Sequence, residues 1–280
     1  MYILSGFADE ISSELKEQID VMKNLSVNYI ELRGVWNKNV LDLAEDEIKK
    51  IKDILMEKDM KISSIGSPIG KIKITDDFFP HFEKFKYAIY LAKFFDTPYV
   101  RIFSYYPPEN EKIEKYRDEV LKRMEKKVRY AEKENIILCH ENESAIYGET
   151  PENCLDILKS INSPNLRAVF DPANFIVHGI KPYSRAYPLL KEWIEYFHIK
   201  DAFPMEKTDN KIICVPAGKG EGQVSEVLKD FYPMTKNKNI FLSLEPHLST
   251  AGQFSGFTGS DKFSLAVNAL NALLAPIIKI

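Results

Sequence analysis

Cysteine is scarce in this chain of 280 residues, which contains Cys139, Cys154 and Cys214 alone. The three are odd in number and widely spaced, and none forms the Cys-x-x-Cys pair of a zinc or redox site. This absence argues against a structural zinc bound by thiolates. We therefore interpret the cysteines as small core or near-surface residues rather than catalytic thiols.

The chain also lacks a long apolar segment and a strong charge of either sign. No run of about 18 apolar residues occurs, and residues 1–6 lack the basic and apolar regions of a secretion signal. The formal net charge of -3 is too small to indicate a nucleic acid or another polyanion as partner. We expect a soluble, cytoplasmic protein without membrane or nucleic-acid partners, and a homo-oligomer remains open.

No Pro/Gly/Ser-rich linker divides the chain, which alternates strand-like and helix-like segments throughout. Strands are predicted at 2–7, 27–32, 61–66, 97–103, 136–141, 166–171, 196–201 and 241–246. Helices are predicted at 10–24, 44–58, 80–95, 111–134, 151–160, 183–195, 223–236 and 260–275. This alternation predicts an α/β fold, a single (β/α)8 TIM barrel over residues 1–280 with a parallel eight-stranded barrel ringed by helices.

The rival architecture is an open doubly wound sheet, which usually carries a Gly-rich phosphate turn after its first strand. Here that strand leads instead into Phe7-Ala8-Asp9-Glu10. The Gly-rich stretch Gly218-Lys219-Gly220-Glu221-Gly222 follows the seventh strand and lacks the lysine and Ser/Thr pair of a P-loop. The sequence therefore favours the barrel and disfavours a nucleotide site.

Four predicted strands carry, towards their C-terminal ends, residues of types that commonly bind metals in proteins, namely Glu141, Asp171, His198 and Glu245. Barrel enzymes place their chemistry at this end of the strands, so the four tips meet if their strand faces look inward. Three clustered carboxylates repel each other without a cation, and with an imidazole they suit Mn, Mg, Co or Zn. We therefore predict one divalent metal ion bound by all four. The alternative for each acid alone is a helix cap or ion pair, and for His198 a buried core histidine.

The motifs at these strand ends resemble those of the xylose isomerase-like barrels. That family includes sugar and sugar-phosphate isomerases and epimerases, inosose-processing enzymes and the type IV apurinic endonucleases. Its strand-end motifs are Glu-Asn, Asp-x-x-(His or Asn), His-x-Lys-Asp and a final Glu. Here they read Glu141-Asn142, Asp171-Pro172-Ala173-Asn174, His198-Ile199-Lys200-Asp201 and Glu245, in the same order over almost the whole chain.

The resemblance implies a metal-dependent isomerase or epimerase that acts on a small carbohydrate, free or phosphorylated. Such enzymes form an enediolate by proton transfer next to a carbonyl. Glu141 and Glu245 would be the catalytic acid/base pair as well as ligands, with Asp171 and His198 as anchoring ligands. An inosose dehydratase-like lyase and a non-catalytic sugar-binding barrel are the alternatives.

Two departures weaken the match to particular members of the family. The ketose 3-epimerases have a substrate-binding His where this chain has Asn174, and an Arg where it has Pro204. The endonucleases use extra histidines at the third and fourth strand ends, where this chain has none. We therefore expect no trinuclear site, and the case for ketose 3-epimerisation in particular is weakened.

Six side chains are candidates for substrate binding: Glu31, Arg33, Arg101, Asn174, Lys200 and His247. Each arginine either binds a carboxylate or phosphate of the substrate or pairs with Glu31 inside the barrel. The pair Lys200-Asp201 offers polar groups to the second ring nitrogen of His198. Candidate aromatic walls of a sugar pocket are Phe7, Tyr105, Tyr106 and Phe257.

Overall fold

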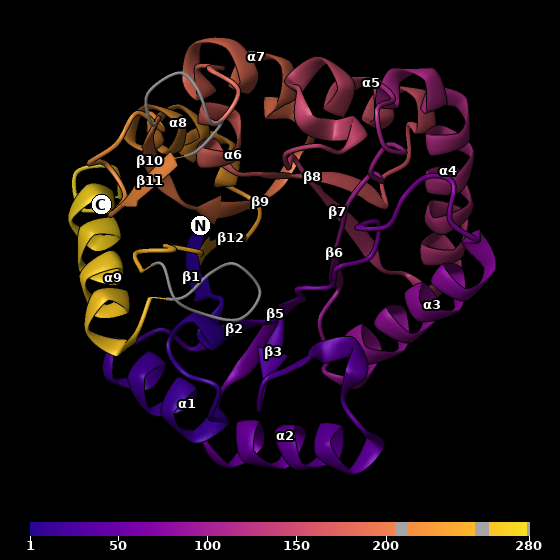
Figure 1. Cartoon of the computed structure of the whole chain (residues 1–280). Coiled ribbons are helices and arrows are strands. Elements are labelled where there is room, and N and C mark those ends of the chain that lie inside the picture. The colour runs from indigo at the N-terminus through magenta and orange to yellow at the C-terminus, as the bar shows by residue number, and fades with distance from the viewer. Residues whose placement is uncertain (205–211, 250–257, 279–280) are drawn as a thin grey trace.

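The computed structural model describes residues 1–204, 212–249 and 258–278. Its centre is one sheet of eight parallel strands in the order β1-β12-β9-β8-β7-β6-β5-β2. The strands β1 and β2 at the two ends of this order also lie side by side, so the sheet curls into a nearly closed barrel (Figure 1). The bounds are β1 (Tyr2–Gly6), β2 (Tyr29–Leu32), β5 (Lys61–Ile65), β6 (Tyr99–Ile102), β7 (Ile137–Glu141), β8 (Leu166–Phe170), β9 (Ile194–Ile199) and β12 (Ile240–Leu244). The predicted barrel is confirmed.

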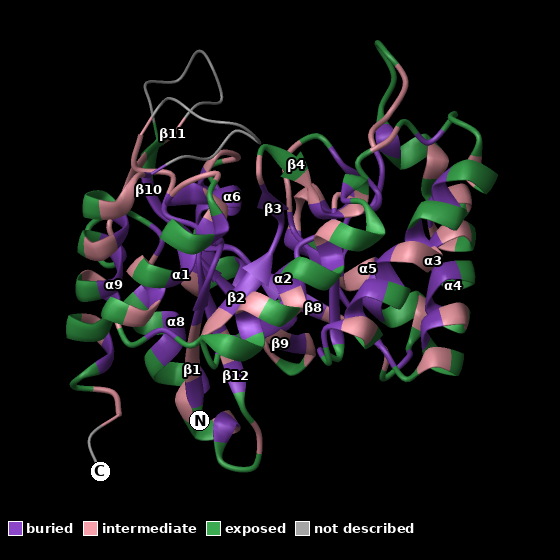
Figure 2. Ribbon diagram, turned by 90° about the horizontal axis from the view of Figure 1, so that it is seen from below, coloured by how far each residue is buried: buried purple, intermediate pink, exposed green. Residues whose placement is uncertain are grey.

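Helices ring the barrel on the outside, and Figure 2 shows their exposed faces turned away from the buried strands. In the longest helix, Val120, Met124, Val128 and Ala131 are buried at helical spacing against the sheet. The bounds are α1 (Leu15–Asn24), α2 (Glu45–Glu57), α3 (Phe78–Phe94), α4 (Arg117–Glu134), α5 (Pro151–Ile161), α6 (Pro172–Ile176), α7 (Tyr187–Leu190), α8 (Val224–Phe231) and α9 (Ser260–Leu274). No helix among the described residues is long and apolar enough to span a membrane.

Two predicted helices depart clearly from the sequence pattern. In place of one helix over 10–24, a 3-10 turn ends at Glu10 and α1 starts only at Leu15, because the Ser12 hydroxyl accepts the backbone N–H of Glu14 and holds an extended step there. The segment 183–195 contains a π-turn, the four-residue α7 and a 3-10 turn, and β9 already begins at Ile194. Pro188 lacks a backbone N–H, so one regular helix cannot form there.

Two short antiparallel hairpins project beyond the ends of the barrel strands. One consists of β3 (Gly34–Val35) and β4 (Lys38–Asn39), directly after β2. The other consists of β10 (Asp201–Pro204) and β11 (Ile212–Val215), directly after β9. Both hairpins border the mouth of the barrel at the C-terminal ends of the strands (Figure 2).

The barrel interior is packed, which fixes which strand faces look inward. A chain of hydroxyls crosses it, since Ser63 Oγ lies 2.6 Å from Ser5 Oγ and 2.8 Å from Tyr196 Oη. Cys139 and Val169 pack beside Tyr196 in a small apolar cluster separate from the main core. Because side chains alternate along a strand, the residues two positions further on also point inward, at the mouth.

Candidate metal and active site

The four side chains predicted to bind a metal converge at the mouth of the barrel. Glu141 ends β7, His198 lies in β9, and Asp171 and Glu245 directly follow β8 and β12. Each is buried, and one ligand atom from each lies within 4.8 Å of those from the other three. The expected juxtaposition of these residues is therefore found.

Local hydrogen bonds hold Asp171 in place. Its Oδ1 accepts the backbone N–H of Asn174 and so caps α6, while Pro172 occupies the first position of that helix. Asn142 donates to the backbone carbonyl of Asp171 and accepts its N–H, which locks the ends of β7 and β8 together. The second oxygen, Oδ2, is left to face the centre of the site.

His198 lies between two carboxylates. Its Nε2–H donates to Glu31 over 3.2 Å, and its Nδ1 lies 3.0 Å from Oε1 of Glu141. Burial lowers the pKa of His198, but Glu141 and Glu31 outweigh it and raise that pKa to about 10. Glu31 therefore fixes the ring, and the prediction that Lys200-Asp201 does so is wrong.

Asp201 serves the Gly-rich stretch instead. Its carboxylate accepts the backbone N–H groups of Ala202, Gly218, Gly220 and Gly222 over 2.8–2.9 Å. A Cβ atom at Gly220 would overlap this carboxylate, so glycine is needed where the backbone approaches so closely. These hydrogen bonds hold the Gly-rich stretch 218–222 against β10.

Three permanent cations pair with the carboxylates of the cluster. Arg101 Nη1 lies 3.2 Å from Glu141, and Arg33 Nη1 lies 2.9 Å from Glu245. Lys200 Nζ lies 3.1 Å from Glu245 as well. The alternative in which the arginines pair with Glu31 is therefore wrong.

These contacts set the ionisation of the acids. Burial raises the pKa of Glu141, but His198 and Arg101 outweigh it and lower that pKa to about 2. The pKa of Glu245 also lies well below its ordinary value, because Lys200 and His247 outweigh burial. Burial, only partly opposed by Lys200, raises the pKa of Asp171 to about 6. Both glutamates are therefore ionised at neutral pH.

The donor set fits a divalent cation. Three carboxylates and one imidazole converge, and Nδ1 of His198 and Oδ2 of Asp171 make no geometrically regular hydrogen bond among the residues that the structure describes, although they lie 3.0 Å from Glu141 and 2.8 Å from Lys200, respectively. Buried polar atoms without partners are rare in proteins and call for a ligand. Oxygen and imidazole donors without thiolate suit Mg, Mn, Co or Zn.

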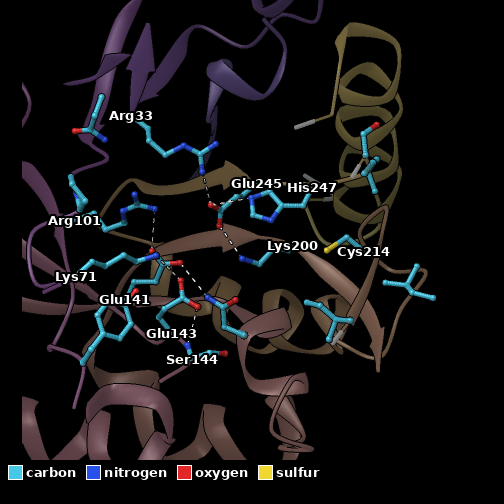
Figure 3. Close-up of a pocket in the computed structure, with 18 residues that line it drawn as sticks. Arg33, Lys71, Arg101, Glu141, Glu143, Ser144, Lys200, Cys214, Glu245 and His247 are labelled. Carbon is cyan, nitrogen blue, oxygen red and sulfur yellow. Dashed lines mark hydrogen bonds and ion pairs between the residues drawn. The ribbon is translucent and has the colours of Figure 1, made fainter. Parts of the chain in front are cut away.

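A cavity of about 950 Å³ opens above the cluster. Of the six predicted substrate-binding residues, five line it: Arg33, Arg101, Asn174, Lys200 and His247 (Figure 3). Glu31 is not among the lining residues, because it is buried behind His198.

The predicted aromatic walls are distributed differently. Tyr106 lines the cavity, whereas Tyr105 is buried behind it against His81. Phe7 lies beneath the arginines, with its ring centre 4.4 Å from Cζ of Arg33 and 4.9 Å from that of Arg101. Phe257 lies outside the described residues.

Several site residues were not predicted from the sequence. Lys71 lies at the rim, where it pairs with Glu143 over 2.9 Å, and Cys214 of β11 forms part of the wall. Asp9 lies 2.8 Å from Arg33, and Glu10 contacts His247. These two acids directly follow β1, so the strand-end pattern used for the four ligands could have identified them.

A nearly closed parallel barrel with a buried carboxylate and histidine cluster at the C-terminal ends of its strands defines a TIM barrel whose mouth could hold a metal ion. The family model described as "Xylose isomerase-like TIM barrel" matches residues 19–229. The chain belongs to the xylose isomerase-like TIM barrel family. No curated protein matches it by sequence.

Solved structures of this fold are similar over nearly their whole length. The probable 3-DHS dehydratase AsbF from Bacillus anthracis is 18% identical over 96% of this chain and 98% of its own, with a TM-score of 0.72. The IOLI protein with a bound zinc atom is 14% identical over 99% and 100%, with a TM-score of 0.74. D-allulose 3-epimerase from Methylomonas sp. is 15% identical over 98% of both chains, with a TM-score of 0.70. At these identities the likeness shows the fold.

Proposed function

We propose that the protein is a divalent-metal-dependent isomerase or epimerase of a small sugar or sugar phosphate. The observation that carries this proposal is the placement of two ionised carboxylates, Glu141 and Glu245, on different strands of one cavity. Two such groups can take a proton from a carbon next to a carbonyl and return it from another side. The epimerase among the similar structures supports this reading.

Glu141, Asp171, His198 and Glu245 would hold the metal ion, which is Mn, Mg, Co or Zn by the chemistry of the donors. When bound there, the ion supplies Lewis-acid stabilisation of negative charge on the substrate oxygens. Asp171 and His198 are the anchoring ligands. Each glutamate has two oxygens, so it can bind the ion with one and move a proton with the other.

The cationic side chains of the cavity orient these bases and the substrate. Arg101 holds one oxygen of Glu141, and Arg33 and Lys200 hold the two oxygens of Glu245. Lys200 also reaches Asp171 over 2.8 Å, so its ammonium lies where an oxyanion of the substrate would form. Asn174 donates from Nδ2 to Asn142 and Glu141 at the cavity wall and can bind a substrate hydroxyl.

A second candidate is a lyase that removes the same proton and then expels a neighbouring hydroxyl as water. The likeness to a probable dehydratase, with a TM-score of 0.72, favours it. The two reactions share the first proton transfer and differ in the bond that breaks afterwards. Asn174 and Pro204, which replace residues of the ketose 3-epimerases, fit either activity.

The test is hydrogen exchange in deuterated water with ketoses, inososes and their phosphates, after metal analysis of the purified protein. We expect deuterium at the carbon next to the carbonyl. We expect Glu141→Gln and Glu245→Gln to slow its incorporation by about 10²–10⁴-fold, whereas Glu152→Gln, an exposed change on α5, leaves it unaltered. A Glu245→Gln variant that binds metal and keeps full exchange would overturn the role of Glu245. Binding of a sugar without any exchange would indicate a sugar-binding barrel.

A further inference from the structure

A second group of metal-binding side chains lies beside the first and shares Glu245 with it. His247 Nε2 lies 3.2 Å from Oε1 of Glu10 and 3.4 Å from Oε1 of Glu245. All three ligand atoms lie within 4.8 Å of one another. Figure 3 shows the imidazole of His247 next to the Glu245 carboxylate, whose two oxygens also contact Arg33 and Lys200.

The ligand atom of Glu10 is buried and has no hydrogen-bond partner. Its other oxygen, Oε2, accepts the backbone N–H of His247 and the hydroxyl of Thr258. Oε1 is thereby held towards Glu245 and His247, and neither it nor His247 Nε2 has a hydrogen-bond partner among the described residues. Glu10 is 0% exposed, so bulk solvent does not reach this oxygen.

The backbone of His247 is turned to allow this arrangement. Its φ of 48° lies in the left-handed region, which residues other than glycine rarely adopt. Such a conformation persists where the surrounding contacts impose it, and it is found preferentially at functional sites. Here it directs both the N–H and the ring of His247 to the Glu10 carboxylate.

The separations of these atoms match those of ligands on one ion. Zinc bonds to imidazole and carboxylate are about 2.0–2.2 Å long, so tetrahedral or octahedral ligands lie roughly 3.0–3.5 Å apart. Nε2 of His247 lies 3.2 Å from Oε1 of Glu10 and 3.4 Å from Oε1 of Glu245, and both distances fall within that range. The ring of His247 also lines the cavity, which leaves an open position for water or substrate.

Arg33 does not already fill the role of this cation. Its Nε lies 2.8 Å from Asp9 and its Nη1 lies 2.9 Å from Oε1 of Glu245, whereas its Nη2 remains 3.9 Å from Oε1 of Glu10. Three cations of the connected cluster, Arg33, Arg101 and Lys200, face six carboxylates: Asp9, Glu10, Glu31, Glu141, Asp171 and Glu245. Without the histidines, the formal charges of these nine groups sum to -3, which is more than one divalent ion compensates.

We propose that Glu10, Glu245 and His247 form a second divalent-cation site, bridged to the first by Glu245. Its oxygen and imidazole donors suit Mn²⁺, Co²⁺ or Zn²⁺. The proposal rests on the proposed function only in that Glu245 is shared. The second cation would lie on the cavity side of His247, where a substrate oxygen can reach it.

The test is metal stoichiometry of the full chain. Chelator-treated protein is dialysed against Mn²⁺, and bound metal is counted and recorded by electron paramagnetic resonance. We expect two ions per chain and the spectrum of an exchange-coupled pair. His247→Gln and Glu10→Gln should each weaken the second ion at least tenfold and leave an uncoupled signal. His178→Gln is the matched control, since its side chain is 18% exposed, as against 19% for His247, and it belongs to neither group.

Each outcome distinguishes this site from the first one. One ion per chain, unchanged in His247→Gln and Glu10→Gln, overturns the second site and leaves the first intact. Two ions that persist in both variants place the second ion elsewhere and also overturn it. No bound metal in the wild type overturns the metal role in the proposed function as well. Circular dichroism shows whether each variant is folded. If the buried change Glu10→Gln prevents folding, the His247→Gln variant, at a partly exposed position, still tests the second site.

Discussion

The imidazole of His198 donates from Nε2 to the carboxylate of Glu31 across the barrel, over 3.2 Å. This bond fixes the tautomer, because a ring that donates from Nε2 presents the Nδ1 lone pair to Glu141, Asp171 and Glu245 when neutral. A metal-bound histidine commonly gives its other N–H to a carboxylate in this way. Glu31 is thus a positioning residue behind the proposed ligand.

We expect Glu31→Gln to weaken Mn²⁺ binding by about 10–100-fold, which is the usual cost of removing such a partner. The amide can present its NH₂ group to Nε2 and so favour the wrong tautomer. A competition assay with a fluorescent chelator measures the affinity. Glu143→Gln, which removes an acid at the rim of the cavity, should leave the affinity within about twofold.

The opposite result would restore the prediction that Glu31 binds substrate. In that case Glu31→Gln would keep its Mn²⁺ affinity and raise KM alone. The position of Glu31 behind His198 and outside the cavity lining argues for the first outcome.

Removal of metal should destabilise the fold. A ligand present at 100 times its Kd stabilises the native state by about 2.7 kcal/mol, which corresponds to roughly 5–10 °C in Tm for a chain of this size. We expect a chelator to lower Tm by this amount and Mn²⁺ or Co²⁺ to restore it, as measured by differential scanning fluorimetry. Asp171→Asn keeps an oxygen to cap α6 but should show no metal-dependent shift. An equal shift in that variant would exclude Asp171 as a ligand.

The carboxylate of Asp201 should be a stability determinant rather than a catalytic one. It accepts backbone N–H groups from Ala202, Gly218, Gly220 and Gly222. Asp201→Asn places an NH₂ donor against those donors, so we expect it to lower the free energy of unfolding by about 3 kcal/mol. Urea denaturation measures it, with the exposed Asp118→Asn on α4 as the control. A change below about 0.5 kcal/mol would contradict this role.

The sequence predicts those features of the site that depend on one strand at a time. The ends of β7, β8, β9 and β12 are visible as apolar runs that stop at Glu141, Asp171, Lys200 and Glu245, and alternation places their side chains on the inner face. The resemblance in motif order and spacing then indicates the family. Because the barrel strands are parallel and the sheet curls round, the side chains at these four strand ends meet at the mouth of the barrel.

Contacts across the barrel could not be predicted in this way. Glu31 and His198 are 167 residues apart and come from strands that are not neighbours in the sheet, so their pairing depends on the curvature of the closed barrel. Glu10 and His247, 237 residues apart, follow β1 and β12, so their contact depends on the pairing of the first barrel strand with the last. Helix 183–195 was predicted wrongly for a local reason, because apolar spacing outweighed the proline at 188.

Lys127 of α4 is fully buried, and its Nζ has no hydrogen-bond partner among the described residues. Its Nζ lies 4.7 Å from the ring centre of Tyr105. The charge of Lys127 also contributes to lowering the pKa values of His81 and His140. Burial, with a smaller contribution from Arg123, lowers the pKa of Lys127 from 10.5 to about 7. The two histidines have pKa values of about 3 and stay neutral at higher pH.

This lysine should make the stability rise with pH. Between pH 7 and 10.5 the unfolded chain binds a proton that the folded Lys127 does not, so its destabilising contribution is full below about pH 7 and vanishes above 10.5. Lys127→Met should therefore raise the free energy of unfolding at pH 7 by roughly 2–4 kcal/mol, with a gain that shrinks at pH 8, 9 and 10. Urea denaturation at each pH measures it, and Lys126→Met, at the exposed neighbouring position, should show no such trend. A gain independent of pH would mean that packing of the methionine, and not loss of the buried amine, stabilises the variant.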